Sequence, residues 1–445
     1  MKKPLCLSLL AGAACAASGP AFGSAFSLME QNASGLGNAY AGAAAVAEDA
    51  STVFFNPAGL TMLKGGQFAA GVDAIRPSAK FSDSGSVASG TGIPIPTAQR
   101  PLGGTGGDAG DWILVPHGYF ATSLSPTWRF GIGVNTPFGL RTEYDPTWMG
   151  RFQAIKSDLR TINVNPSLAW RASDAVSIGF GINYQTIKAE LSKAVNYVAA
   201  VAASNPAAAA AIPAANAEGK VTIKGDDATW GYNLGVLFTP TPATRLGVSY
   251  RSSIDYRVSG KINFDNTPPG ALGAAFANGD VFLDIKMPDI LSFALAQQVA
   301  PKWQLLADAT WTGWAKIKQL QFMRSNGATL ETTPENFKNT WRIGLGTNYR
   351  WSDRVTVKAG IAHDRTPVND QDRTPRLPDS DRTWLSLGSQ YRVGSADTID
   401  IGFAHLFMKD ARIDQNAGST AGFGRLTGTY KNSVDILAIQ YTHTF

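Results

Sequence analysis

The chain has 445 residues and a formal net charge of +5 at neutral pH, from 39 basic and 34 acidic residues. Two of the basic residues, Lys2 and Lys3, lie in an N-terminal leader, and the charge that remains is too small to indicate a nucleic-acid partner. The only two cysteines, Cys6 and Cys15, lie in the same leader, which excludes disulfides, soft-metal sites and thiol catalysis in the rest of the chain.

Residues 1–23 have the pattern of a signal peptide. Two lysines precede an apolar stretch over residues 5–17, and the small residues of Ala21-Phe22-Gly23 suit cleavage before Ser24. The apolar stretch is too short to cross a bilayer as a helix. We therefore expect export of the chain and a mature start near Ser24. A lipoprotein that begins at Cys15 is the alternative, and the residues before this cysteine disfavour it.

Residues 24–65 differ from everything that follows them. The segment is rich in Ala, Gly and Ser and shows no alternation of apolar and polar residues. Asp49, Asn56 and Pro57 favour helix caps and turns over a strand. The residues alone leave two structures open for this segment, which are a compact piece packed inside a crowded domain and a disordered arm.

A period of two dominates the chain from residue 66 to residue 445. In one stretch the apolar residues Trp341, Ile343 and Leu345 alternate with polar or very small ones, and the pattern recurs over residues 176–184. Such alternation predicts strands with one apolar and one polar face. No linker interrupts it, so we expect a single all-β domain over 66–445.

The connections between these expected strands are of two kinds. Short turns lie at 125–127, 171–175, 240–244, 300–301, 351–354 and 394–397. Long polar or Gly-rich connections lie near 80–114, 139–160, 192–228, 265–282, 324–339, 365–381 and 410–429. Because the two kinds alternate, we expect a transmembrane antiparallel β-barrel of about 14 strands with both termini on the short-turn side.

The C-terminus and the aromatic residues support an outer-membrane location. The last strand ends in Phe445, which is what the barrel-assembly machinery of the Gram-negative outer membrane reads. Aromatic side chains near the expected strand ends suit girdles at the two interfaces with lipid and lipopolysaccharide. They include Trp112, Tyr119, Trp128, Trp148, Trp170, Trp303, Trp311, Trp314 and Trp351.

Motifs along the whole mature chain occur in a fixed order. They are Ser34-Gly35-Leu36-Gly37-Asn38-Ala39-Tyr40, Asn56-Pro57-Ala58, Trp311-Thr312-Gly313-Trp314 and Leu377-Pro378-Asp379-Ser380-Asp381-Arg382. In these motifs the chain resembles the FadL family of outer-membrane long-chain fatty acid transporters. The resemblance implies a 14-stranded barrel whose lumen is plugged by a hatch, here residues 24–65.

The resemblance also implies a route and a set of ligand contacts. Family members capture their ligand in a groove among the outer loops, hold it in an apolar pocket and release it sideways through a gap in the wall. The implied contacts are Phe26 at the mature N-terminus and the basic Lys188. A second basic position of the family is Gln321 here, with Arg324 close to it. Trp311 and Trp314 are further candidates. For each basic residue a solvated barrel rim is the alternative role, and for each tryptophan ordinary packing.

Two segments are candidates for moving parts of this route. The third expected strand ends in Pro137, Phe138 and Gly139, and proline cannot donate to a strand ladder, so these residues are candidates for the lateral gap. The alternative is a plain strand end before a loop. Residues 194–227 contain an alanine run that forms either short amphipathic helices at the outer mouth or an irregular loop.

Other functions remain as alternatives to fatty acid uptake. A related barrel could take up aromatic or aliphatic hydrocarbons, which need no cationic partner. An outer-membrane enzyme is disfavoured because the histidines are scattered and no nucleophile motif accompanies them. A pure adhesin or phage receptor leaves the hatch unexplained. We expect no catalytic residues, metal or cofactor, and a monomer.

Acidic residues in the loop 365–381 raise the possibility of a calcium site. Asp379 and Asp381 belong to this loop, as do several arginines. We expect surface salt bridges between them instead.

Overall fold

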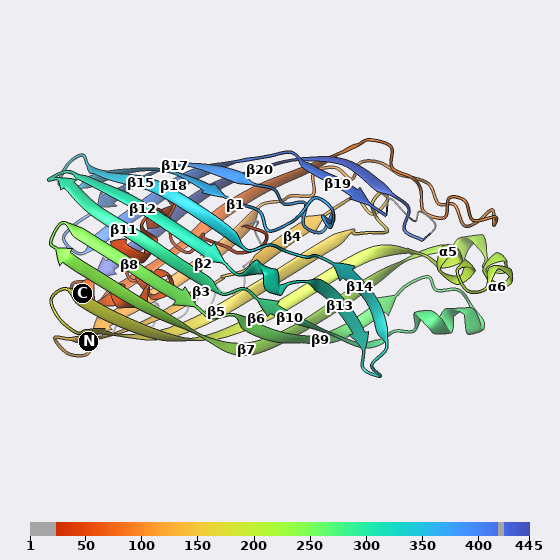
Figure 1. Ribbon diagram of the computed structural model, residues 1–445, viewed down its shortest axis with the longest axis horizontal. Coiled ribbons are helices and arrows are strands. Elements are labelled where there is room, and N and C mark those ends of the chain that lie inside the picture. The colour runs from red at the N-terminus through yellow and green to blue at the C-terminus, as the bar shows by residue number, and fades with distance from the viewer. Residues whose placement is uncertain (1–23, 417–421) are drawn as a thin grey trace, which may run out of the picture.

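The computed structural model describes residues 24–416 and 422–445, so the expected signal peptide, residues 1–23, lies outside the described residues. The fold is a closed antiparallel barrel of 14 strands, as predicted (Figure 1). In chain order these strands are β1 (Gln67–Asp83), β2 (Ile113–Ser123), β3 with β4 (Trp128–Asn135 and Gly139–Glu143), β5 (Lys156–Arg171), β6 (Val176–Asn196), β7 (Glu218–Thr241), β8 with β9 (Thr244–Arg251 and Ile254–Phe264), β10 with β11 (Gly279–Met287 and Ile290–Ala300), β12 with β13 (Trp303–Thr312 and Gln319–Arg324), β14 with β15 (Thr329–Pro334 and Thr340–Arg350), β16 (Val355–Asp364), β17 (Arg382–Arg392), β18 with β19 (Asp397–Met408 and Ala411–Gln415) and β20 (Leu426–Thr444).

The first and last strands close the barrel. β1 pairs with β20 in continuous antiparallel register from Gln67 opposite Thr444 to Asp83 opposite Gly428. Closure removes the free edges that an open sheet would expose to lipid, where water cannot satisfy unpaired backbone groups. The sequence pattern sets the two faces of this wall. Ile343 and Leu345 are each 58% exposed on the outside, whereas Arg342, directly before Ile343, is 4% exposed and points into the lumen.

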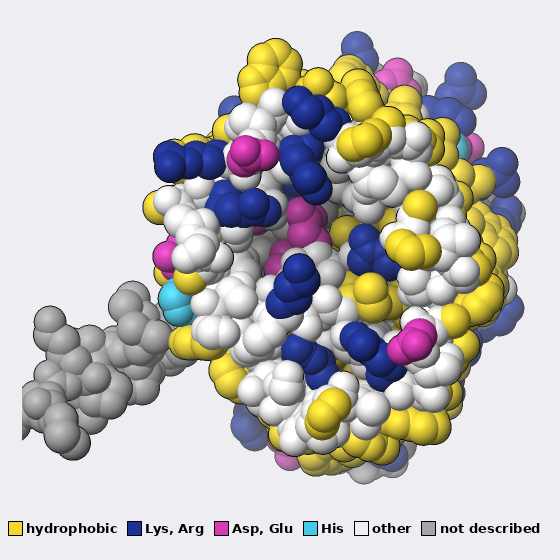
Figure 2. All heavy atoms as spheres, turned by 90° about the vertical axis from the view of Figure 1, so that its left-hand side faces the viewer, with side chains coloured by type: hydrophobic (Ala, Val, Ile, Leu, Met, Phe, Trp, Pro, Cys, Tyr) yellow, Lys and Arg dark blue, Asp and Glu magenta, His cyan; other side chains and the backbone are white. Residues whose placement is uncertain are grey.

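The two ends of the barrel differ in the way predicted. The C-terminus and the short turns lie at one end, and the longer connections lie at the other (Figure 1). Viewed from the short-turn end, Lys and Arg side chains surround a central hollow that contains acidic groups (Figure 2). The strands extend further into the outer region than expected. β6 and β7 pair as far as Asn196 and Glu218, so the connection expected over 192–228 shrinks to 197–217.

Short helices lie in the N-terminal segment and in the outer connections. They are α2 (Ala33–Leu36), α3 (Ala43–Val46), α4 (Thr52–Phe55), η1 (Pro57–Met62), α5 (Tyr197–Ala202), α6 (Pro206–Ala210), η2 (Ala214–Asn216), η3 (Gly270–Phe276) and η4 (Trp314–Lys316). The helices α5 and α6 fall in the alanine-rich connection, where helices were one of the two expectations. In the described parts of the chain, no helix has the length and hydropathy needed to cross a membrane.

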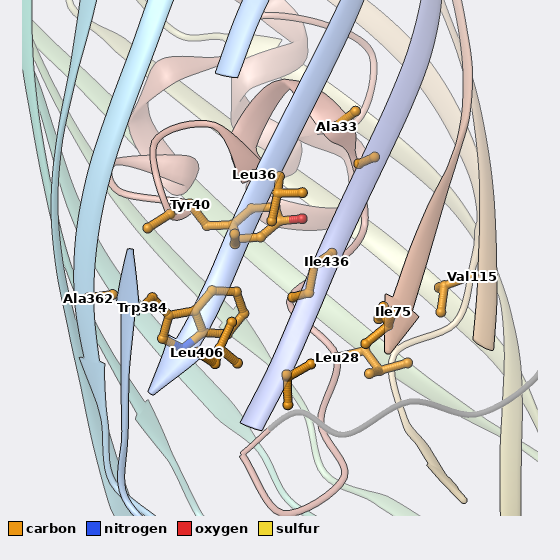
Figure 3. Packing of buried hydrophobic residues seen from close by; sticks show 14 of the residues in the cluster. Leu28, Ala33, Leu36, Tyr40, Ile75, Val115, Ala362, Trp384, Leu406 and Ile436 are labelled. Carbon is orange, nitrogen blue, oxygen red and sulfur yellow. The ribbon is translucent and has the colours of Figure 1, made fainter. Parts of the chain in front are cut away.

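Residues 24–65, called the N-terminal segment below, pack against the inner faces of the strands. Leu28, Leu36 and Tyr40 are fully buried against wall residues that include Trp384 and Leu406 (Figure 3). The Tyr40 and Trp384 rings meet edge to face with their centroids 6.3 Å apart. The segment is therefore part of the hydrophobic core.

The Asn56-Pro57-Ala58 motif holds this segment against β6 and β7. Asn56 caps η1 by accepting a hydrogen bond from the Ala58 N–H, and its side-chain amide donates to the carbonyl oxygens of Ala44 and Val236. Glycines in the wall make room for the motif. A Cβ at Gly179 would lie 2.3 Å from the Ala58 nitrogen, so a larger residue there would displace η1.

Basic side chains of the wall also hold the N-terminal segment. Each donates a hydrogen bond to a backbone carbonyl of the segment, and such charge-assisted bonds are stronger than neutral ones. The pairs are Arg129 with Leu63 and Gly65, Arg171 with Thr61, Arg245 with Val46, Arg251 with Phe54, Arg342 with Ala39, and Lys358 with Ser34.

Lys358 is the basic residue whose loss should be most damaging to this attachment. Its ammonium is 1% exposed and lies 2.9 Å from Glu48 of the segment and 3.1 Å from Asp400 of β18. Lys358→Met leaves both carboxylates without their cation, so we expect the unfolding free energy to fall by about 3–5 kcal/mol. Urea unfolding in lipid vesicles measures this loss, with Lys302→Met in an exposed turn as the control. Equal stability of the two variants would contradict this assignment.

Candidate functional site

An apolar pocket lies inside the barrel above the N-terminal segment. Its volume is about 930 Å³, including the part that opens to solvent. The inward side chains of β5, β6, β7, β9 and β10 supply most of its wall, because most of the inward residues along this part of these strands are apolar. The apolar lining includes Phe26, Leu140, Leu159, Ile187, Leu191, Ile223, Val258, Val281, Leu283, Ile285, Ile317, Leu320, Phe322, Phe337 and Leu377.

An aromatic cluster lies at the bottom of this pocket, and two of its members, Phe26 and Phe337, line it. The ring of Phe26 packs edge to face on Trp314 with centroids 4.8 Å apart, and Phe138 lies 6.1 Å from Phe26. Phe337 extends the cluster from the other side of Trp314, at 6.1 Å. Three residues singled out in the sequence, Phe26, Phe138 and Trp314, are thus brought together.

The wall is interrupted beside this cluster. β2 pairs with β3 only from Gly118 to Ser123, and its residues 113–117 pair with β1 alone. β4 in turn pairs only with β5. Between β3 and β4, residues 136–138 interrupt the regular ladder: Pro137 has no N–H to donate, and only the Phe138 carbonyl still accepts a backbone hydrogen bond from β5, from Thr161. Within the described residues, no strand pairing joins β2 to β4.

The start of the N-terminal segment is bonded to this interruption. The Leu28 N–H donates to the Pro137 carbonyl at 2.8 Å, and the Gly139 N–H donates to the Phe26 carbonyl at 2.8 Å. The side-chain amide of Gln31 donates to the Thr136 carbonyl at 2.8 Å. Phe26 therefore contacts the pocket with its ring and the strand interruption with its backbone.

A layer of buried carboxamides lies on the short-turn side of the pocket. Along β5 and β6 the inward residues change from Leu159 and Ile187 to Asn163 and Asn183 within a few positions. The Asn163 amide donates to Asn183 Oδ1 at 3.1 Å, and the Asn183 amide donates to Asn233 Oδ1 at 3.0 Å. The apolar part of the lumen ends at this layer.

One basic and one acidic side chain line the outer part of the pocket. Arg376, in the connection between β16 and β17, donates to the Lys156 carbonyl and to the Ser157 hydroxyl, each at 3.1 Å. Glu335, in the irregular stretch between β14 and β15, is 4% exposed. Burial raises the pKa of the Glu335 carboxyl to about 8, although the nearby Arg376 guanidinium acts in the opposite direction. Near neutral pH this carboxyl is therefore largely protonated, and the other acidic group near Arg376, Glu331, is paired with Lys193 at 2.6 Å.

A wider hollow leads from the outer end of the barrel to this pocket. Its volume is about 2060 Å³, including open solvent, and residues 192–206 with α5 form one side. Leu191, Ile223, Phe322 and Arg376 line both the hollow and the pocket, so the two spaces meet at these residues.

The remaining sequence candidates lie elsewhere. Lys188 is exposed on the outer surface, because on β6 it alternates with the inward Ile187. Arg324 ends β13 and donates to the Ala277 carbonyl near the outer rim. Trp311 pairs across the strands with Trp341, which is 45% exposed on the outer face. None of these three side chains lines the apolar pocket.

The expectation of surface salt bridges in the 365–381 loop was wrong for its inner part. Asp379 is 3% exposed and pairs with the buried Arg382 at 2.5 Å. The loop folds into the lumen, which also brings Arg376 to the pocket. Local composition cannot distinguish a solvated charged loop from one that enters a barrel, so Arg376 and Glu335 were missed.

Comparisons with known proteins agree with this architecture. Residues 13–445 match a family model described as "Outer membrane protein transport protein (OMPP1/FadL/TodX)". A long-chain fatty acid transport protein of Salmonella typhi is 30% identical over 419 residues, which cover 92% of this chain and 93% of that protein. Outer membrane protein P1 of Haemophilus influenzae is 31% identical over 422 residues, or 90% of this chain and 89% of that protein.

Solved structures show the same fold. A Pseudomonas aeruginosa FadL homologue superimposes with a TM-score of 0.86 at 26% identity, covering 94% of this chain and 99% of that one. The toluene transporter TodX of P. putida has a TM-score of 0.65 at 18% identity, covering 89% and 94%. The second likeness concerns the fold alone.

Proposed function

The chain belongs to the OMPP1/FadL/TodX family of outer membrane transport proteins, and from this premise we propose that its substrates are long-chain fatty acids. It is a β-barrel transporter of hydrophobic compounds in the Gram-negative outer membrane, not an enzyme. The proposal concerns which hydrophobic compounds it carries and by what route.

The observation that carries the proposal is the position of Arg376. A fatty acid has an apolar tail and a carboxylate, and a buried carboxylate needs a cationic partner. Arg376 lies where the outer hollow meets the pocket, and the wall beyond it is apolar. Each methylene that leaves water for such a wall gains about 0.8 kcal/mol. In this proposal the carboxylate of the fatty acid lies beside Arg376 and its tail packs against the apolar wall.

The proposed route runs from the outer hollow into the pocket and then sideways between β2 and β4. In this proposal the N-terminal segment is a hatch whose two parts differ in role. Residues 33–65 stay in place because the basic side chains of the wall hold their carbonyls. Residues 24–31 move, since Phe26 fills the bottom of the pocket and its backbone bonds to Gly139. A ligand tail that displaces the Phe26 ring loosens the contact at the strand interruption.

Uptake of labelled oleate, with toluene as competitor, tests the proposed substrate. The protein is expressed in cells that lack their own transporter. We expect saturable oleate uptake that toluene competes for only weakly, because toluene has no group for Arg376. Toluene uptake without oleate uptake would instead assign the chain a hydrocarbon substrate.

The same assay has a pH arm that depends on Glu335. Its raised pKa means that the carboxyl is neutral below about pH 8 and ionises above it, where it draws the Arg376 charge away from a bound carboxylate. Oleate affinity of the purified protein should therefore fall as the pH rises from about 7 to about 9. Glu335→Gln should abolish this dependence, whereas a dependence that persists in the variant would exclude Glu335 as its source.

A further inference from the structure

A small polar hollow at the short-turn end of the barrel contains two arginines and no acidic residue. Its volume is about 360 Å³, including the part open to solvent. The lining residues are Thr61, Leu63, Ser123, Ser125, Pro126, Thr127, Arg129 and Arg171. Several Lys and Arg side chains lie on this end of the molecule (Figure 2).

The two arginines come from neighbouring strands. On β3 and β5, Trp128 pairs with Trp170, and the Arg171 N–H donates to the Thr127 carbonyl at 2.8 Å. Arg129 is 9% exposed. Through part of their guanidinium groups the arginines bond to backbone carbonyls of the N-terminal segment, as described above. Carbonyl dipoles orient these groups without neutralising either charge.

Neither arginine has a counter-ion. In residues 24–416 and 422–445, no carboxylate forms an ion pair with Arg129 or Arg171. Within the same residues, Nε of Arg129 and both Nε and Nη1 of Arg171 lack a hydrogen-bond acceptor. The hydroxyls of Ser123 and Thr127 line the same hollow. Two adjacent positive charges with free N–H and O–H donors form a site for an oxyanion.

The surrounding surface indicates where such an anion comes from. The rings of Trp128 and Trp170 stack at 6.0 Å with an interplanar angle of 20°, and both are more than 40% exposed on the outer wall. Exposed tryptophans at a strand end mark the level of lipid headgroups. Each tryptophan directly precedes an arginine of the hollow, so the hollow lies at that level but on the inner face of the wall. The turn residues Ser125, Pro126 and Thr127 line it at the rim, where a lipid headgroup can reach it over the β2–β3 turn.

We propose that this hollow binds the phosphate of a phospholipid headgroup from the inner leaflet of the outer membrane. Bound there, the phosphate neutralises Arg129 and Arg171 and ties the β2–β3 turn to the end of the N-terminal segment at Thr61 and Leu63. This site lies at the opposite end of the β2–β3 hairpin from the strand interruption, and it does not depend on the transported substrate.

Titration calorimetry of the full mature chain in detergent tests the site. The probes are dihexanoyl-phosphatidylglycerol, the corresponding diacylglycerol without phosphate, and inorganic phosphate. We expect saturable binding of the phospholipid and none of the diacylglycerol. Arg171→Gln should weaken phospholipid binding about tenfold or more. Arg354→Gln, an equal charge change in the exposed turn between β15 and β16, should leave it unchanged.

Three results would overturn the proposal. They are equal binding of the diacylglycerol, equal losses in the two arginine variants, and inorganic phosphate that binds as tightly as the phospholipid, which would make the site one for free phosphate. If Arg171→Gln does not fold, as judged by circular dichroism, Thr127→Val takes its place. That variant keeps both charges and removes a donor, so it should also weaken phospholipid binding, and unchanged binding would count against the site.

Discussion

Linking β2 to β4 across the interrupted wall should stop oleate uptake. Cysteines replace Leu114 of β2 and Arg141 of β4, and a bifunctional methanethiosulfonate that a reductant can cleave joins them. The leader holds the only native cysteines, so these two thiols are unique in the mature chain. If the ligand leaves sideways here, the linker blocks the exit and uptake should fall about tenfold or more.

Cleavage of the linker provides the internal control. Reductant should restore uptake in the same cells. A second control is a pair of cysteines at Leu345 and Ile361, which are register partners on β15 and β16. The wall is continuous there, so linking these two positions should leave oleate uptake unchanged. Oleate uptake that continues with β2 and β4 joined would exclude this opening as the exit.

Replacing Arg376 with Gln should weaken oleate binding by about 2 kcal/mol, or roughly thirtyfold, because the carboxylate loses its charged donor. Toluene binding should stay the same, since only the apolar wall contributes to it. Arg376→Lys should recover part of the oleate affinity, as it restores the charge without the planar fork. The measurement is a titration of purified protein with each ligand.

Lys188→Gln and Arg324→Gln are the matched controls for Arg376. The sequence pointed to both residues, but the structure places both side chains away from the pocket. Each variant removes one positive charge, as Arg376→Gln does. A loss of oleate affinity in Lys188→Gln as large as in Arg376→Gln would show that overall charge, not the pocket, determines binding.

The barrel was predictable because its signals are periodic. Alternation around Ile343 and Leu345 shows which residues face lipid, and alternating turn and loop lengths fix the number of strands. Phe26 and Trp314 were proposed from a family resemblance, and the structure brings them into contact at 4.8 Å. Apart from the resemblance, nothing in the sequence indicates that two residues so far apart are in contact.

The charged contacts were not predictable because they depend on how loops fold. Arg376 and Glu335 lie on two connections that a pattern of residues cannot distinguish from solvated surface. The outward face of Lys188 was predictable, because it continues the alternation of the lipid-facing Ile178, Ile182 and Tyr184 along β6. Only the family resemblance pointed to it as a ligand contact.

The carboxamide layer of Asn163, Asn183 and Asn233 marks the inner end of the apolar pocket. Above it the lumen is apolar, and within it the amides of Asn163 and Asn183 each donate to a neighbouring carboxamide oxygen. An alkyl chain has no group to replace the hydrogen bonds that it would break there, and each would remain unmade at a cost of about 1–3 kcal/mol. The barrel can therefore admit an apolar ligand from the outer end while the carboxamide layer opposes its passage along the barrel axis.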